Sequence, residues 1–170
     1  GDGIHRRRPM TTRPPLLSRD VVQRLVLVVV AYVPMLLNDV GRVAADTKAY
    51  LYLDPGRLLA RALYMWQPEV ALGSVTHQNI GYLWPVGPFF WLGEALGLPD
   101  WITQRLWLGS VLLAAGLGMR WFLRTLGWRG PAMLVSSLAY MLSPYLLNYV
   151  DRHSVILLPW AGLPWLMGLT

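Results

Sequence analysis

Four long apolar runs, separated by polar segments, constrain the fold of this chain more than any other feature of its sequence. Each run is close to the length of about 17 to 25 residues that crosses the hydrocarbon core of a bilayer as an α-helix. Of the 170 residues, 55% are hydrophobic and only 14% are charged, against about 25% charged residues in a soluble domain. We therefore predict an all-α membrane protein with multi-pass transmembrane helices. The predicted spans cover residues 21–37, 102–119, 131–147 and 155–170.

The positions of the arginines predict how these spans are oriented. Residues 1–20 contain five arginines and three prolines, so we expect a disordered cytoplasmic tail there. The segment after the second span is also rich in arginine and lacks acidic residues, which is typical of a cytoplasmic loop. The net charge of +6 follows this pattern and is not gathered on one face, so no nucleic-acid partner is expected. On this topology the loop over 38–101 and the short loop at Asp151 share the outer face.

Two shorter structural segments are expected inside the long outer loop. Asp54 followed by Pro55 is typical of a helix start, and the apolar spacing after it predicts an amphipathic interfacial helix over 55–66. Residues 82–98 are long enough to cross the membrane, but a crossing there would place the arginine-rich segment outside. We therefore predict a re-entrant segment, a hairpin of two short pieces broken by its prolines.

The outer loop also gathers most of the acidic residues. Asp39 lies where the first span ends, Asp54 has a sufficient role as a helix cap, and Glu94 lies inside the predicted re-entrant segment. Asp46 has two interpretations: it caps a short helix over 47–53, or it acts in catalysis. Asp39 and Asp46 do not have a recognised metal-ligand spacing, and the chain contains no cysteine. We therefore expect no metal and no cofactor.

Several short motifs occur in a fixed order along the chain. Together they resemble the α-(1,3)-arabinofuranosyltransferase family of mycobacteria and other actinobacteria, and the likeness extends over about residues 45–170. The motifs are DTK at 46–48, DPGRLLARA at 54–62, GYLWP at 81–85, GPFF at 87–90, WITQRLW at 101–107 and LSP at 142–144.

The resemblance implies a fold and a reaction. It implies a GT-C glycosyltransferase core whose first outer loop carries a catalytic aspartate, with a polyprenyl-phosphate sugar of the decaprenylphosphoryl-arabinose type as donor. The acceptor would be a cell-wall polysaccharide such as arabinogalactan or lipoarabinomannan. Because members of that family are several times longer, we expect this chain to be the N-terminal portion of a longer protein. The active site would lie on the extracytoplasmic side of the cell membrane.

The chemistry of such a transfer indicates which residue types the site needs. A carboxylate takes the proton from the acceptor hydroxyl in an inverting reaction, a cation stabilises the departing phosphate, and polar or aromatic surfaces hold the sugar. The resemblance assigns the first role to Asp46. For Trp84 a place in the aromatic belt at the membrane interface is the ordinary interpretation, and for the arginines it is an interfacial anchor. The expected donor-binding residues are Lys48, His77, Asn79, Trp84, Arg105, Arg152 and His153.

Two other classes of protein share some of these features. A flippase or transporter for polyprenyl-linked glycans also has apolar spans and outer charges, but is expected to contain paired broken helices or an inverted repeat. A non-catalytic membrane assembly subunit has no need of an aspartate in its first outer loop. Both remain alternatives to the glycosyltransferase.

Overall fold

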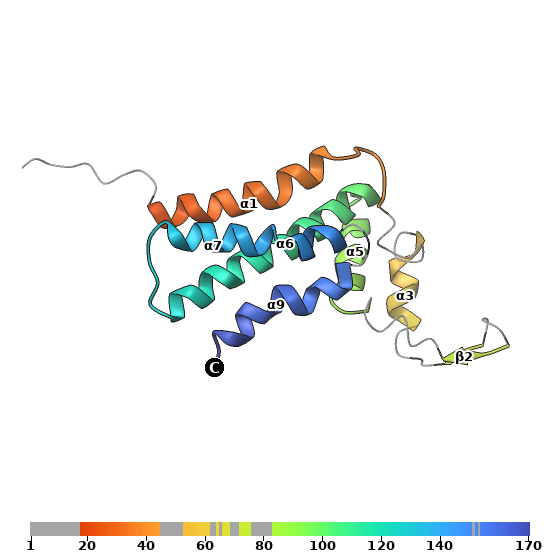
Figure 1. Ribbon diagram of the computed structural model, residues 1–170. Helices are drawn as coiled ribbons and strands as arrows, with labels where there is room; N and C mark the ends of the chain where they lie inside the picture. Colours follow the sequence, from red (N-terminus) through yellow and green to blue (C-terminus); the bar gives the residue numbers. More distant parts are fainter. Residues whose placement is uncertain are drawn as a thin grey trace, which may run out of the picture.

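The protein is built around one long helix. The computed structural model describes residues 18–44, 53–61, 64, 66–68, 72–75, 83–150, 152 and 154–170. Helix α6 (Asp100–Thr125) runs through the centre, as Figure 1 shows. Three helices pack against it: α1 (Arg19–Leu37), α7 (Ala132–Met141) and α9 (Leu157–Met167).

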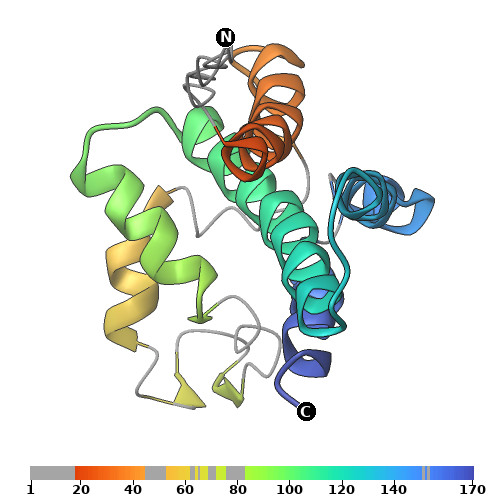
Figure 2. The ribbon, with the colours of Figure 1, turned by 90° about the vertical axis from the view of Figure 1, so that its left-hand side faces the viewer.

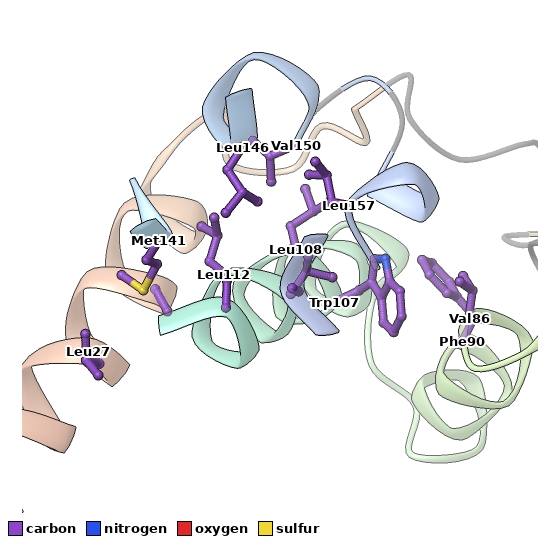
Figure 3. Packing of buried hydrophobic residues seen from close by; sticks show 14 residues of the cluster. Leu27, Val86, Phe90, Trp107, Leu108, Leu112, Met141, Leu146, Val150 and Leu157 are labelled. Atoms are coloured by element: carbon purple, nitrogen blue, oxygen red, sulfur yellow. The ribbon is translucent and has the colours of Figure 1, made fainter. Parts of the chain in front are cut away.

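The core lies where these helices meet along α6. Figure 3 shows Leu108 and Leu112 of α6 between Leu27 of α1, Met141 of α7 and Leu157 of α9. All five side chains are buried almost completely. Leu108 and Leu112 are four residues apart and share one face of α6, where they meet side chains from its partners.

Small residues in α6 allow its partners to approach closely. Gly109 lies against the ring of Tyr32 in α1, and a Cβ atom at Gly109 would overlap that ring. The hydroxyl group of Tyr32 is hydrogen-bonded to the Oγ of Ser110 at 2.9 Å. Glycine at this position is therefore a packing requirement, as in close helix pairs inside membranes.

Among the described helices, α1 and α6 are long and apolar enough to cross a membrane. At 1.5 Å per residue, the 26 residues of α6 extend over about 39 Å, more than the hydrocarbon thickness of about 30 Å. The third predicted span is interrupted: α7 ends at Met141, and a separate helix α8 (Pro144–Tyr149) follows. Pro144 explains the break, because it cannot continue the hydrogen bonding of α7. The fourth predicted span is divided into a 3-10 turn η2 (Ser154–Ile156) and α9.

The described part of the outer loop forms a smaller unit beside α6. Figure 2 shows α3 (Pro55–Arg61) and α5 (Val86–Ala95) on one flank of α6 and α7 on the opposite flank. The helix predicted over 55–66 ends earlier than expected, because Trp66 lies in strand β1 (Trp66–Gln67). This strand pairs in antiparallel register with β2 (Ser74–Val75).

Of the segment predicted as a re-entrant hairpin over 82–98, the structure describes residues from Leu83 on: Leu83 is helical, residues 84 and 85 form a turn, and one helix follows. Helix α5 is continuous over ten residues, and Pro88 lies in its first turn. The backbone N–H groups of a first helical turn have no partner inside the helix, so a proline there removes no hydrogen bond. The prolines of this segment therefore begin the helix and do not break it.

Candidate functional site

The first turns of α6 bury three consecutive polar side chains. Gln104 is fully buried, and Arg105 and Thr103 are 2% and 3% exposed. Burying polar groups costs free energy unless they are hydrogen-bonded, and burying a charge costs more. Packing stability alone therefore does not explain why polar residues occupy this end of α6.

Gln104 holds the polypeptide that follows α1. Its Oε1 accepts a hydrogen bond of 2.7 Å from the backbone N–H of Ala44, and its Nε2 donates one of 2.9 Å to the carbonyl oxygen of Ala44. Both backbone groups of one residue are therefore satisfied by a single side-chain amide, 60 residues away in the sequence. This pairing anchors the start of the outer loop directly on α6.

Helix α5 closes one side of the same region. Gly93 lies so close to Thr103 that a Cβ atom at this glycine would collide with the threonine side chain. Phe89 meets Trp107 edge-on, with ring centroids 5.3 Å apart. The turn of α6 that carries Arg105 is therefore covered by α5.

A buried hydrogen bond brings a second outer segment to this turn. The indole N–H of Trp107 donates to the Oγ of Ser154 at 3.0 Å, and both residues are buried. Arg152 comes two residues before this serine and is exposed, with its backbone N–H bonded to the carbonyl oxygen of Tyr149 at 3.1 Å. The segment around 152 and the loop after α1 are thus both attached within one turn of Arg105 on α6.

The structure describes three of the predicted site residues, and the other five lie outside the described residues. Arg105 is buried in α6, Arg152 is exposed after α8, and Trp84 is 75% exposed just before α5. The burial of Arg105 argues against a simple interfacial anchor, whereas the exposure of Trp84 fits the aromatic-belt interpretation. The remaining predicted site residues lie outside the described residues; they are Asp46, Lys48, His77, Asn79 and His153.

One of the competing carboxylates, that of Asp54, has a local role. The carboxylate of Asp54 accepts a hydrogen bond of 2.8 Å from the backbone N–H of Arg57, which confirms the predicted helix cap. Asp39 is exposed in the turn after α1 with a left-handed backbone, and Glu94 is exposed on α5. In the part of the chain that the structure describes, no three acidic or histidine side chains form a group able to hold a metal ion.

Sequence reasoning missed Gln104. It lies within the WITQRLW motif, yet an isolated glutamine at the start of an apolar helix gives no indication of its partner. One sequence feature could have indicated Gln104: it directly precedes Arg105, the predicted phosphate-binding arginine, in a helix whose other residues are mostly apolar. The partner, a backbone peptide group, has no side-chain signature in the sequence.

The fold and the site together define a class: a helical protein with two helices able to cross a membrane and a buried polar centre at one end of the longer one. A family profile narrows this class. The profile described as "Alpha-(1->3)-arabinofuranosyltransferase, N-terminal GT-C domain" matches residues 29–169, and the chain belongs to this family. The family resemblance predicted from the motifs is therefore confirmed.

Two relatives are similar in sequence to most of the chain. They are the α-(1->3)-arabinofuranosyltransferases of Mycobacterium tuberculosis and Mycolicibacterium smegmatis, each 38% identical over 135 residues. Each match covers 76% of this chain and 10% of the relative. The chain thus spans about a tenth of the length of the curated relatives it matches.

Solved structures show the same fold. The cryo-EM structure of arabinofuranosyltransferase AftD from mycobacteria superimposes with a TM-score of 0.78 at 35% identity, covering 87% of this chain and 11% of that one. A mutant form of that protein gives a TM-score of 0.79 at 34% identity, covering 88% of this chain and 12% of the other. The helical architecture is therefore the one that this family uses.

Proposed function

We propose that this chain is the N-terminal part of a membrane glycosyltransferase that transfers arabinofuranose from a polyprenyl-phosphate donor to a cell-wall polysaccharide. The donor would be of the decaprenylphosphoryl-arabinose type, and the acceptor arabinogalactan or lipoarabinomannan. The observation that carries this proposal is the pairing of Gln104 with Ala44 beside the buried Arg105. It joins the loop that bears the candidate base to the helix that bears the candidate phosphate ligand.

The covalent chain supports Asp46 as the base. Asp46 follows Ala44 by two residues, so the two Cα atoms are separated by at most about 7 Å. Ala44 is itself bonded to the residue that precedes Arg105. We therefore propose that the carboxylate of Asp46 and the buried guanidinium of Arg105 act on one bound phosphosugar.

Asp46 and Arg105 have different roles in the proposed reaction. The acceptor hydroxyl oxygen attacks the anomeric carbon, and the bond between that carbon and the phosphate oxygen breaks, leaving its electron pair on the phosphate. Asp46 takes the hydroxyl proton, and inversion follows from attack on the face opposite the leaving group. Arg105 binds the departing phosphate through its planar fork, in a site where low solvent access strengthens the interaction.

The other expected donor contacts complete the site. Arg152 belongs to a segment attached near Arg105, and Trp84 precedes the helix that covers the same turn. A phosphosugar needs hydrogen-bond partners and a stacking surface in addition to one cation. We include Lys48, His77, Asn79 and His153 in this role on the family resemblance.

The surface of the bundle supports a place in the membrane. On α1, large apolar side chains at Val22, Leu25, Val29, Val33 and Leu37 are exposed, which a soluble surface rarely tolerates as a continuous stripe. We propose that α1 and α6 cross the bilayer. The pairs α7 with α8 and η2 with α9 would form two interrupted spans, and the rest of a longer chain would cover them. The Gln104 end would then face the extracytoplasmic side.

The test is Asp46→Asn in the full-length protein. Loss of a positioned general base typically costs about 10²- to 10⁴-fold in rate, so we expect such a fall in arabinose transfer from a lipid-phosphate donor, with donor binding retained. Asp39→Asn is the matched control, because it removes a carboxylate from the same loop and is expected to leave transfer within about twofold. Normal transfer by Asp46→Asn would remove the assignment of the base.

A further inference from the structure

The opposite end of the bundle carries a pocket that the proposed transfer reaction does not use. Its volume is about 730 Å³, and its walls come from the start of α1, the end of α6 and the turn before α7, at the left of Figure 1. Position 120 is 16 residues along α6 from Gln104, which corresponds to about 24 Å. The pocket is therefore separate from the candidate transfer site.

The charge of the pocket wall is strongly positive. Four arginines and a single carboxylate line it, which gives a formal charge of 4 − 1 = +3. Among the residues that the structure describes, Arg19 and Arg129 form no ion pair. The lining charges are Arg19, Arg120, Arg124, Arg129 and Asp20.

One of these arginines is buried and held in place. The side chain of Arg120 is 5% exposed, and it donates to the side-chain oxygen of Gln23 and to the carboxylate of Asp20. Its Nε atom is buried without a hydrogen-bond partner. Since buried polar groups are nearly always hydrogen-bonded, Arg120 is an exception that its contacts with the described residues leave only partly satisfied.

The carboxylate of Asp20 is shared among several cations. Besides Arg120, it forms ion pairs with Arg24 at 2.9 Å and with Arg124 at 3.3 Å. One carboxylate therefore forms ion pairs with three guanidinium groups. The cluster is left with a surplus of positive charge, which attracts anions.

Stability of the helices does not explain the whole cluster. Arg124 lies in the last turn of α6, where a cation interacts favourably with the helix dipole. Arg19, by contrast, is the first residue of α1, where a cation is disfavoured by the same effect. The general preference of arginine for cytoplasmic ends explains the sign of the charge, but not why the arginines surround a pocket.

The pocket wall also has an apolar part. Gln23 donates to the carbonyl oxygen of Gly130 at 3.3 Å, which holds the turn after α6 against α1. Trp128, Val22 and Met133 then lie in the wall beside the arginines. A cationic centre next to apolar and aromatic surface matches a ligand that has an anionic head and a hydrocarbon body.

We propose that this pocket binds the phosphate group of an anionic phospholipid from the leaflet at that end of the bundle. Arginine side chains bind phosphate oxygens in pairs of parallel hydrogen bonds. The volume of about 730 Å³ lies within the range of roughly 300 to 1,000 Å³ that is usual for small-molecule sites. The bound lipid would link the start of α1 to the end of α6 and to the turn that follows.

The experiment is a lipid titration of the detergent-solubilised full-length protein, read out by native mass spectrometry. The probes are dioleoylphosphatidylglycerol and dioleoylphosphatidylcholine, with inorganic phosphate in a separate series. We expect dioleoylphosphatidylglycerol to bind more tightly than dioleoylphosphatidylcholine. The double variant Arg19→Gln with Arg129→Gln should weaken that binding by at least about tenfold, because each removed cation contributes charge-assisted hydrogen bonds.

The matched control is Arg24→Gln. It removes one positive charge from the same end of α1 as Arg19, but Arg24 does not line the pocket, so lipid affinity should change by less than about twofold. Arg19 and Arg129 are exposed, so both variants are expected to fold. Equal binding of the two lipids, or equal losses in both variants, would overturn the proposal. Binding of inorganic phosphate without any lipid preference would overturn the lipid as ligand and indicate a soluble anion.

Discussion

At the scale of single residues, the side-chain amide of Gln104 is the contact on which the proposed site depends. It is fully buried and satisfies both backbone groups of Ala44. An apolar side chain at position 104 would leave these groups without their partner, at a cost of about 1–3 kcal/mol for each unsatisfied buried group. Because Asp46 follows Ala44 so closely, a loosened anchor would move the candidate base away from the candidate phosphate ligand.

The variant Gln104→Leu tests this positioning role. We expect kcat for arabinose transfer to fall by about 10- to 100-fold with little change in KM for the donor, because misplacement of a reacting group by about 1 Å can cost about 100-fold. Steady-state kinetics of the full-length protein would measure both constants.

Thr103→Val is the control for that experiment. Thr103 is also buried in the same turn, and among the described residues its hydroxyl makes one long hydrogen bond, of 3.4 Å, to the carbonyl oxygen of Pro99. The two variants should therefore differ in kcat by at least about tenfold. Equal losses of kcat in both would show that Gln104 contributes to packing alone.

At the scale of elements, α6 determines where every other described helix of the bundle can lie. Its glycines accept bulky side chains from two partners, Tyr32 of α1 at Gly109 and Trp165 of α9 at Gly118. The indole N–H of Trp165 donates to the carbonyl oxygen of Ala114 at 2.9 Å, and its ring stacks on Trp121. Inside a membrane such close packing and hydrogen bonding contribute more to helix association than the hydrophobic effect does.

The substitution Gly109→Ala should destabilise the bundle although alanine is the better helix former. The added Cβ atom overlaps the ring of Tyr32, and overpacking of this kind typically costs about 1–3 kcal/mol. Gly162→Ala in α9 is the control: no atom lies within 4 Å of its added Cβ atom, so a neutral or stabilising effect of up to about 1 kcal/mol is expected. Thermal unfolding of the full-length protein in detergent compares the two. A higher midpoint for both variants would mean that helix propensity, and not the contact with Tyr32, decides the outcome.

At the scale of the whole molecule, the bundle has two chemically different ends. One end holds the buried Gln104 and Arg105 with the anchored outer loop, and the other holds the arginine pocket around Arg120. The two lie about 24 Å apart along α6, close to the hydrocarbon thickness of a bilayer of about 30 Å. The arginine distribution favours the cytoplasm for the second end.

Labelling of single cysteines would test this orientation. The 170 residues contain no cysteine, and both Arg42, in the turn after α1, and Arg129, in the turn after α6, are exposed. In whole cells we expect Arg42→Cys to react with a membrane-impermeant maleimide, and Arg129→Cys to react only after permeabilisation. The reverse pattern would place the candidate transfer site in the cytosol, where the proposed extracytoplasmic reaction has no place.

The sequence by itself determined the features that depend on neighbouring residues. The helix cap at Asp54 and the extent of α1 are local matters of hydrogen bonding and hydrophobic length, and they were predicted nearly as observed, whereas α6 continues to Thr125, beyond the predicted end at 119. The family motifs likewise carried the resemblance without any knowledge of contacts.

Only the tertiary structure decided which distant groups meet. Gln104 is hydrogen-bonded to Ala44, 60 residues away in the sequence, and Arg120 to Asp20, 100 residues away, because helix packing brings their elements together. Packing also placed α5 against both α3 and α6, and the sequence pattern of residues 82–98 gave no indication of these partners. A sequence pattern reports the preference of a segment, but the partner of a buried polar group is chosen by the geometry of the whole bundle.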